Sequence, residues 1–123
     1  MPYGQEVIID LCDCDPTTYD TREKIEGFLW EVCDLIGAEP KDLHFWDYAG
    51  RPEEYAEAED RFKGTSAVQF ILTSSLVIHA LDVLKTVYLN VFSCASFDAE
   101  AVVKHAVDTF SGTLMQQHGM DRL

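Results

Sequence analysis

Short apolar runs rich in β-branched residues alternate along this chain with stretches of helical periodicity. The first run, residues 6–12, predicts a strand that ends before Asp15-Pro16. The next stretch has its apolar residues at helical spacing, with Asp20 as the expected N-cap and Gly37 just after the last of them. The apolar stripe of this predicted helix consists of Ile25, Phe28, Leu29, Val32, Leu35 and Ile36.

The rest of the chain predicts mainly strands. Residues 43–48 are rich in aromatic side chains and predict a second strand, whereas the acidic residues 51–63 predict an exposed loop or a short helix. Further strands are predicted at residues 66–73, 76–81 and 86–94. The tail of the chain could add an edge strand at residues 114–117. Asp98 is placed to cap a second helix, which carries apolar residues as far as Phe110 and is closed by Gly112.

This order of elements indicates a two-layer α+β sandwich, in which two helices cover one face of a mostly antiparallel sheet. A length of 123 residues fits one domain, residues 1–123. No apolar run approaches the roughly 20 residues that a membrane span needs. The first residues also lack the pattern of a signal peptide, so we expect a cytoplasmic protein that does not bind membranes.

The charge balance excludes one large class of partners. A formal net charge of −13 argues against nucleic acid, because binding phosphate requires clustered Lys and Arg. An acidic surface is compatible with a cationic small molecule, such as an amine or a sulfonium. The four cysteines show no zinc-binding spacing, so no metal is expected.

Four residues with reactive side chains lie in the predicted strands or in the turn between them: Ser66, Ser74, His79 and Cys94. Taken singly, each has an ordinary structural interpretation, as a turn serine, a partly buried histidine or a small apolar thiol. Their spacing is the informative feature, because Ser66 precedes Ser74 by eight residues, and His79 and Cys94 follow it by five and twenty.

With these intervals the sequence resembles the small prokaryotic S-adenosylmethionine decarboxylases over about residues 4–112. The run from Gly4 to Asp10 and the pair Cys14-Asp15 fall where that family has its first strand. Phe92-Ser93-Cys94 is similar to the family's Phe-Thr-Cys-Gly. The resemblance implies the same α+β sandwich and a homodimer with active sites near the subunit interface.

The resemblance also implies a self-derived pyruvoyl cofactor and no metal. Ser74 falls at the pyruvoyl precursor and would attack the carbonyl of Thr73, so that the chain cleaves itself between these two residues. His79 and Ser66 fall at the processing residues. The pyruvoyl ketone would form a Schiff base with a substrate amine and accept the electrons left by CO₂. Cys94 falls at the general acid that returns a proton.

Two departures from the family keep several functions open. The family has Glu-Ser-His at the cleavage site, whereas this chain has Thr73-Ser74-Ser75. After the processing histidine the family has Thr-Trp-Pro-Glu, but here Leu81 and Val83 replace the aromatic residue and the carboxylate. The main expectation is an S-adenosylmethionine decarboxylase of spermidine synthesis. A same-fold decarboxylase of arginine or ornithine, and an uncleaved binding or regulatory homologue, are the alternatives.

Overall fold

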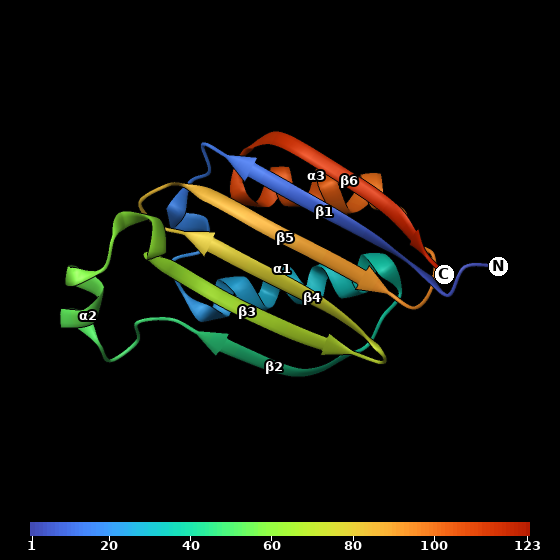
Figure 1. The fold of residues 1–123 in the computed structure, drawn as a ribbon, viewed down its shortest axis with the longest axis horizontal. Helices are drawn as coiled ribbons and strands as arrows, with labels where there is room; N and C mark the ends of the chain where they lie inside the picture. The colour runs from blue at the N-terminus through green and yellow to red at the C-terminus, as the bar shows by residue number, and fades with distance from the viewer.

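The computed structural model describes residues 1–123 and places a six-stranded sheet in front of its helices, as Figure 1 shows. All neighbouring strands are antiparallel, and their order is β2-β3-β4-β5-β1-β6. The strands are β1 (Gly4–Cys12), β2 (Pro40–Trp46), β3 (Gly64–Ile71), β4 (Ser74–Leu81), β5 (Thr86–Ser93) and β6 (Thr113–Arg122). The helices are α1 (Arg22–Ile36), α2 (Pro52–Glu57) and α3 (Ala99–Phe110), with 3-10 turns at Pro16–Thr18 and Asp60–Phe62. The expected α+β sandwich is confirmed, and its sheet is antiparallel throughout.

The core lies between α1, α3 and the sheet because side chains alternate between its two faces. In β4 the residues Leu76, Ile78 and Ala80 are completely buried, and His79 between them is exposed. The same alternation runs through β5 and β1. The short helix α2 is not part of this layer and lies beyond one end of the sheet (Figure 1).

The structure corrects the predicted ends of α1. Thr21, rather than Asp20, is the N-cap, and its hydroxyl accepts a hydrogen bond from the backbone N–H of Lys24 at 3.2 Å. Asp20 instead forms an ion pair with the Lys24 ammonium at 2.8 Å. At the other end Gly37 adopts the left-handed conformation expected of a C-cap, with φ = 72°. Leu35 was expected in the buried stripe but is 45% exposed, because Cys33 fills the core position.

The C-terminal region also differs from the prediction. Asp98 caps α3 as expected, but the left-handed residue that ends the helix is Ser111, with φ = 51°, and not Gly112. Gly112 instead allows close packing against β1 and the residues after it, because a Cβ at this position would lie 2.7 Å from the sulfur of Cys14. The final strand β6 is far longer than the predicted residues 114–117 and pairs with β1 along its whole length.

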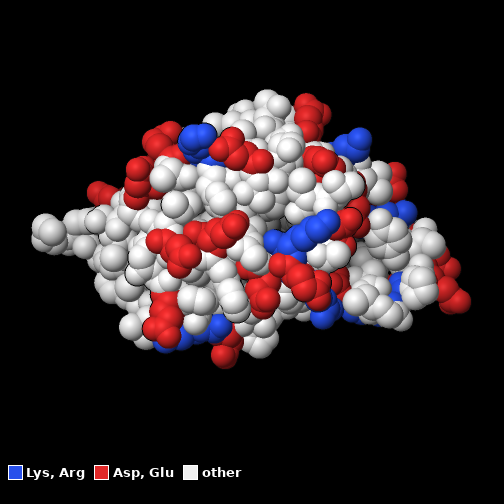
Figure 2. Space-filling model, turned by 180° about the vertical axis from the view of Figure 1, so that it is seen from behind, with Lys and Arg blue, Asp and Glu red and all other residues white.

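The two faces of the sheet present different surfaces. On the helix-covered side, Asp and Glu side chains are scattered across the surface (Figure 2). The face of the sheet that no helix covers, here called the open face, instead carries exposed apolar side chains on several strands: Ile8, Trp46, Phe70, Tyr88 and Met120. One of its acidic residues, Glu6, is engaged by Arg122 and by the amide of Asn90.

Candidate active site

The tight turn between β3 and β4 holds the first pair of predicted site residues. Ile71 pairs with Ser74 across the hairpin, which leaves Leu72 and Thr73 as the two turn residues. The Ser74 side chain is 8% exposed and lies on the helix-facing side of the sheet. Its hydroxyl donates a hydrogen bond to the Leu72 carbonyl at 3.1 Å and accepts one from the backbone N–H of Cys94 at 2.7 Å.

Cys94 directly follows β5 and lies beside this turn. Its thiol donates a weak hydrogen bond to the Leu72 carbonyl, with a sulfur–oxygen distance of 3.5 Å. The neighbouring hydroxyls of Ser74 and then Thr73 favour the thiolate, which holds the pKa of Cys94 below the ordinary value of a thiol. The other two thiols with shifted values behave oppositely, since burial raises the pKa of Cys14 and of Cys33 to about 11.

A cavity of about 250 Å³ opens beside Ser74 and Cys94. It lies between the end of α1 and the tips of the strands, and most of its lining is apolar. Two charged residues reach it, Glu39 and Lys41, whose carboxylate and ammonium are 3.8 Å apart. The cavity therefore offers an apolar chamber next to the serine and the thiol, with one group of each charge at its edge.

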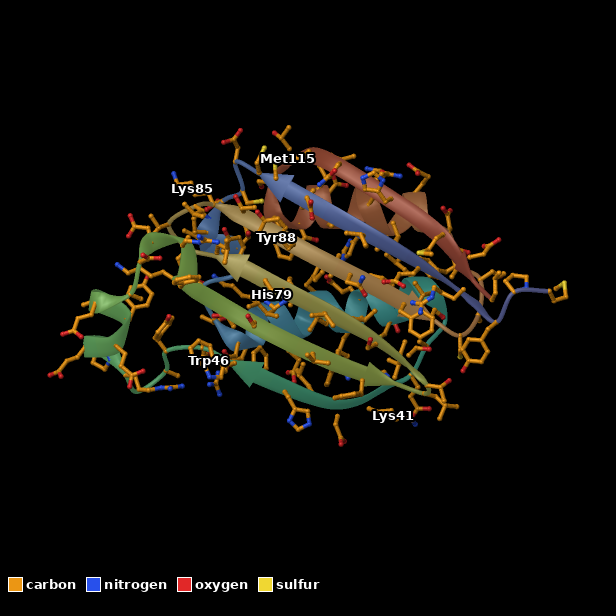
Figure 3. The ribbon with its side chains drawn as sticks, viewed as in Figure 1. Lys41, Trp46, His79, Lys85, Tyr88 and Met115 are labelled. Carbon is orange, nitrogen blue, oxygen red and sulfur yellow. The ribbon has the colours of Figure 1, made fainter.

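Ser66 and His79 form the second pair, on the open face. They are direct neighbours across β3 and β4, and the Ser66 hydroxyl is 2.7 Å from Nδ1 of His79. Trp46 pairs with Ser66, and Tyr88 pairs with His79, so all four residues form one row across the sheet. Figure 3 shows Trp46, His79 and Tyr88 along this row, facing the viewer.

The two pairs do not meet within one chain. Ser74 and His79 are five residues apart on the same strand, so their side chains point to opposite faces of the sheet. The distance along the strand is about 16 Å at roughly 3.3 Å per residue. His79 therefore cannot remove a proton from Ser74 of its own chain.

Comparisons with known proteins agree with this fold. A family model described as S-adenosylmethionine decarboxylase matches residues 5–123. The chain belongs to this family. A crystal structure of the adenosylmethionine decarboxylase from Aquifex aeolicus VF5 has a TM-score of 0.75, with 15% sequence identity over 98% of this chain and 91% of that one. No curated protein matches the sequence.

One of the positions at which this chain departs from the family pattern lies beside a second cavity, of about 460 Å³, on the open face. Leu81, which stands where the family has Trp, lines it together with Ser66 and His79. Its other walls come from three elements and are mainly aromatic, with Arg61 beside them: Trp46, Tyr48, Phe62 and Tyr88. The sequence analysis missed this grouping, because only the strand register and the chain reversal after β2 bring these residues together.

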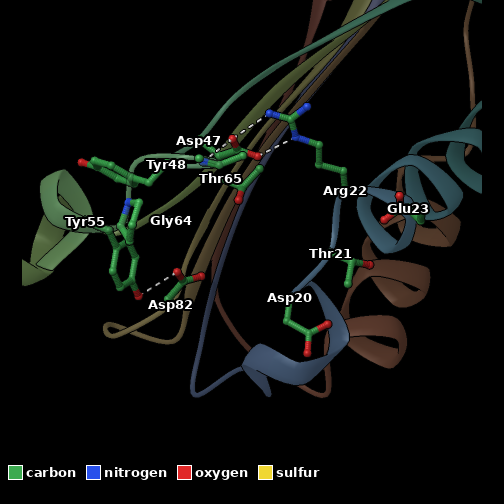
Figure 4. Close-up of a pocket in the computed structure, with 13 residues that line it drawn as sticks. Asp20, Thr21, Arg22, Glu23, Asp47, Tyr48, Tyr55, Gly64, Thr65 and Asp82 are labelled. Atoms are coloured by element: carbon green, nitrogen blue, oxygen red, sulfur yellow. Dashed lines mark hydrogen bonds and ion pairs between the residues drawn. The ribbon is translucent and has the colours of Figure 1, made fainter.

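A larger cavity, of about 710 Å³, contains none of the four predicted site residues (Figure 4). It lies where α2 meets the sheet. The Arg22 guanidinium binds both oxygens of Asp47 at 2.7 and 2.8 Å, and the Tyr55 hydroxyl donates to Asp82 at 3.1 Å. The Arg22 contact lowers the pKa of Asp47. The first contact joins the segment after β2 to α1, and the second joins α2 to the turn after β4.

Neither a metal-binding cluster nor a helix able to span a membrane is found in the structure. No group of three or more His, Cys, Asp or Glu side chains is arranged to hold a metal ion. None of the helices has the length and apolar character required to cross a bilayer.

Proposed function

We propose that this protein is a pyruvoyl-dependent S-adenosylmethionine decarboxylase of spermidine synthesis in the cytoplasm, which cleaves its own chain between Thr73 and Ser74. The observation that carries the proposal is the 2.7 Å hydrogen bond from the Cys94 backbone to the Ser74 hydroxyl. It brings the nucleophile, the bond to be cut and the thiol together at one turn. A buried serine whose hydroxyl oxygen accepts a backbone N–H is also suited to carry developing negative charge.

The residues at the turn fit the formation of a pyruvoyl group. Ser74 Oγ would bond to the Thr73 carbonyl carbon while the Thr73–Ser74 C–N bond breaks, and the hydroxyl proton would pass to the freed amine. Elimination would then release Thr73 as a carboxylate, and water would replace the nitrogen, which leaves as ammonia. Once formed, the group supplies a ketone that binds a substrate amine and accepts the electron pair released with CO₂. The Cys94 thiol holds the proton that the substrate carbon then receives.

Because Ser74 and His79 of one chain cannot meet, the proposal requires a homodimer in which His79 of one protomer acts on Ser74 of the other. In the proposed two-fold dimer, which would form through the open faces, the β3–β4 turn of one protomer would lie over the Ser66–His79 pair of its partner. A depression of about 310 Å³ between Phe70 and Phe92 reaches Thr73 and Ser74 and gives such a group a route to the bond. A second copy would also cover apolar side chains that a monomer rarely leaves exposed together.

The aromatic cavity favours adenosylmethionine over arginine or ornithine. Trp46 and Phe62 are 53% and 56% exposed, and they offer flat surfaces beside His79 that can replace the missing Trp of the family. Stacking of a nucleic acid base on an aromatic side chain contributes about 1–3 kcal/mol. Arginine and ornithine have no ring that would use this surface.

The intact mass of the purified protein under denaturing conditions tests the proposal. Two fragments, residues 1–73 and residues 74–123 with a pyruvoyl group in place of Ser74, are expected. Decarboxylation assays with adenosylmethionine, arginine and ornithine then identify the substrate. A single full-length species that persists through long incubation would overturn the proposal in favour of an uncleaved binding or regulatory homologue.

A further inference from the structure

Thr73, the residue before the bond to be cut, has an unfavourable backbone conformation. Its φ is 50°, in the left-handed region. This region suits glycine or asparagine at the second position of a two-residue turn, and a β-branched residue is rarely found there because its Cβ substituents meet the backbone. Thr73 therefore raises the free energy of the folded, uncut chain at the point of cleavage.

A residue far away in the sequence holds Thr73 in this position. The phenol hydroxyl of Tyr3 donates a hydrogen bond to Thr73 Oγ1 at 2.8 Å, across 70 residues of chain. Two contacts hold Tyr3 in place. Its backbone N–H donates to the Arg122 carbonyl at 2.7 Å, and its ring lies 6.4 Å from that of Phe92, measured between ring centres. The contact thus joins the turn to the ends of both terminal strands.

We propose that Tyr3 is a positioning residue for self-cleavage, which holds Thr73 in its strained conformation until the Thr73–Ser74 bond breaks. The inference rests on the proposed self-cleavage. When Ser74 Oγ takes the Thr73 acyl group, the planar amide becomes an ester. After elimination Thr73 is a free chain end, with a carboxylate and no turn geometry to satisfy. The strain is therefore present before the cut and absent after it, which favours the forward direction.

Replacement of Thr73 distinguishes a role in self-cleavage from a role in folding stability alone. Thr73→Gly accepts the left-handed conformation, so the unfolding midpoint should rise while cleavage slows by about tenfold. A residue that only supports the structure would change both quantities in the same direction. The midpoint is measured in the Ser74→Ala background, where every chain stays uncut, and the cleavage rate is measured with Ser74 present.

Two further variants isolate the hydroxyl contact. Tyr3→Phe removes only the phenol oxygen and should slow cleavage by about three- to tenfold. Thr73→Val should slow it to a similar degree, and the double variant should be no slower than either single one, because both remove the same bond. Thr73→Ser keeps a hydroxyl at this position and should restore most of the rate.

Lys85 provides a matched control. It has the same φ of 50° in the turn between β4 and β5, at the other end of the sheet. Lys85→Gly should therefore stabilise the fold and leave the cleavage rate unchanged. If Thr73→Gly and Tyr3→Phe cleave as fast as the native chain, the inference is wrong and the proposed function stands. If the native chain itself never cleaves, both are wrong.

Discussion

The two ends of the β3–β4 hairpin carry different pairs of reactive side chains. At the turn, Ser74 and Cys94 lie on the helix-facing side next to a small apolar cavity. Farther along, Ser66 and His79 lie on the open face among aromatic side chains. In the proposed reaction, the first end would supply the nucleophile and the acid but no base, and the second would supply an imidazole that lies far from the bond to be cut. If the proposed roles hold, a single chain contains all the required side chains but cannot bring them together, so a second copy is needed.

Mixing two inactive variants tests whether Ser74 of one chain depends on His79 of another. Ser74→Ala lacks the nucleophile and His79→Ala lacks the imidazole, so each protein alone should remain uncut. When the two are co-expressed in equal amounts and pair randomly, about half of the His79→Ala chains should be cleaved, because half have a partner with His79. Mass spectrometry distinguishes the chains. If His79→Ala alone is cleaved at the native rate, His79 has no part in processing.

Substitution of Cys94 tests whether its thiol acts in decarboxylation, in self-cleavage or in both. Cys94→Ala keeps the backbone N–H that binds Ser74, so cleavage should proceed nearly as in the native protein. Turnover should fall by about 10²- to 10⁴-fold, the usual contribution of a general acid. The cleaved fraction and the rate of CO₂ release are measured on the same preparation. Equal losses in both would mean that Cys94 acts in processing rather than in decarboxylation.

A charge on the open face should separate the two protomers. Ile8 is 41% exposed and lies between Asn90 and His118 on this face. Ile8→Glu should give a monomer in light scattering and slow cleavage by about tenfold or more, because the two-fold axis brings like charges together. Trp30→Glu is the matched control, since Trp30 is 50% exposed on α1 at the opposite side of the molecule. Its protein should remain a dimer.

The smallest expected effect concerns the acidity of Cys94. The hydroxyls of Ser74 and Thr73 favour its thiolate, so its pKa is lowered and it should be alkylated by iodoacetamide faster at pH 8 than an ordinary thiol. In the uncut His79→Ala protein, addition of Thr73→Val should raise this pKa and slow alkylation by about two- to threefold. Cys14 and Cys33, with pKa values of about 11, should react only on unfolding. Peptide mapping identifies each site, and an unchanged Cys94 rate would exclude a contribution from Thr73.

The strands were predictable because buried and exposed residues alternate along them, and the helices because their apolar residues recur at helical spacing. The pattern of Val87, Leu89 and Val91 against Tyr88, Asn90 and Phe92 appears in the structure as buried and more exposed faces of β5. The helix ends were harder, since Asp20 and Thr21 are both acceptable caps and the ion pair of Asp20 with Lys24 decides between them. Such choices depend on side-chain geometry that spacing does not record.

For the candidate site, the sequence indicated the residues but not their arrangement. The odd interval between Ser74 and His79 already implies opposite faces once both lie on one strand, so this part of the geometry could have been derived. The contact of Tyr3 with Thr73 could not, because it depends on how β1 is inserted into the sheet. The same holds for the aromatic cavity, whose walls come from separate elements.

That insertion of β1 has a consequence for the protein after a cut at the turn. Residues 1–73 would supply β1, β2 and β3, and residues 74–123 would supply β4, β5 and β6. In the strand order, β1 lies between β5 and β6, so one fragment is held on both sides by the other. Separation would require both of its hydrogen-bonded ladders to open along with the β3–β4 pairing. The two polypeptides would therefore stay associated, and a cut would free the turn without freeing either fragment.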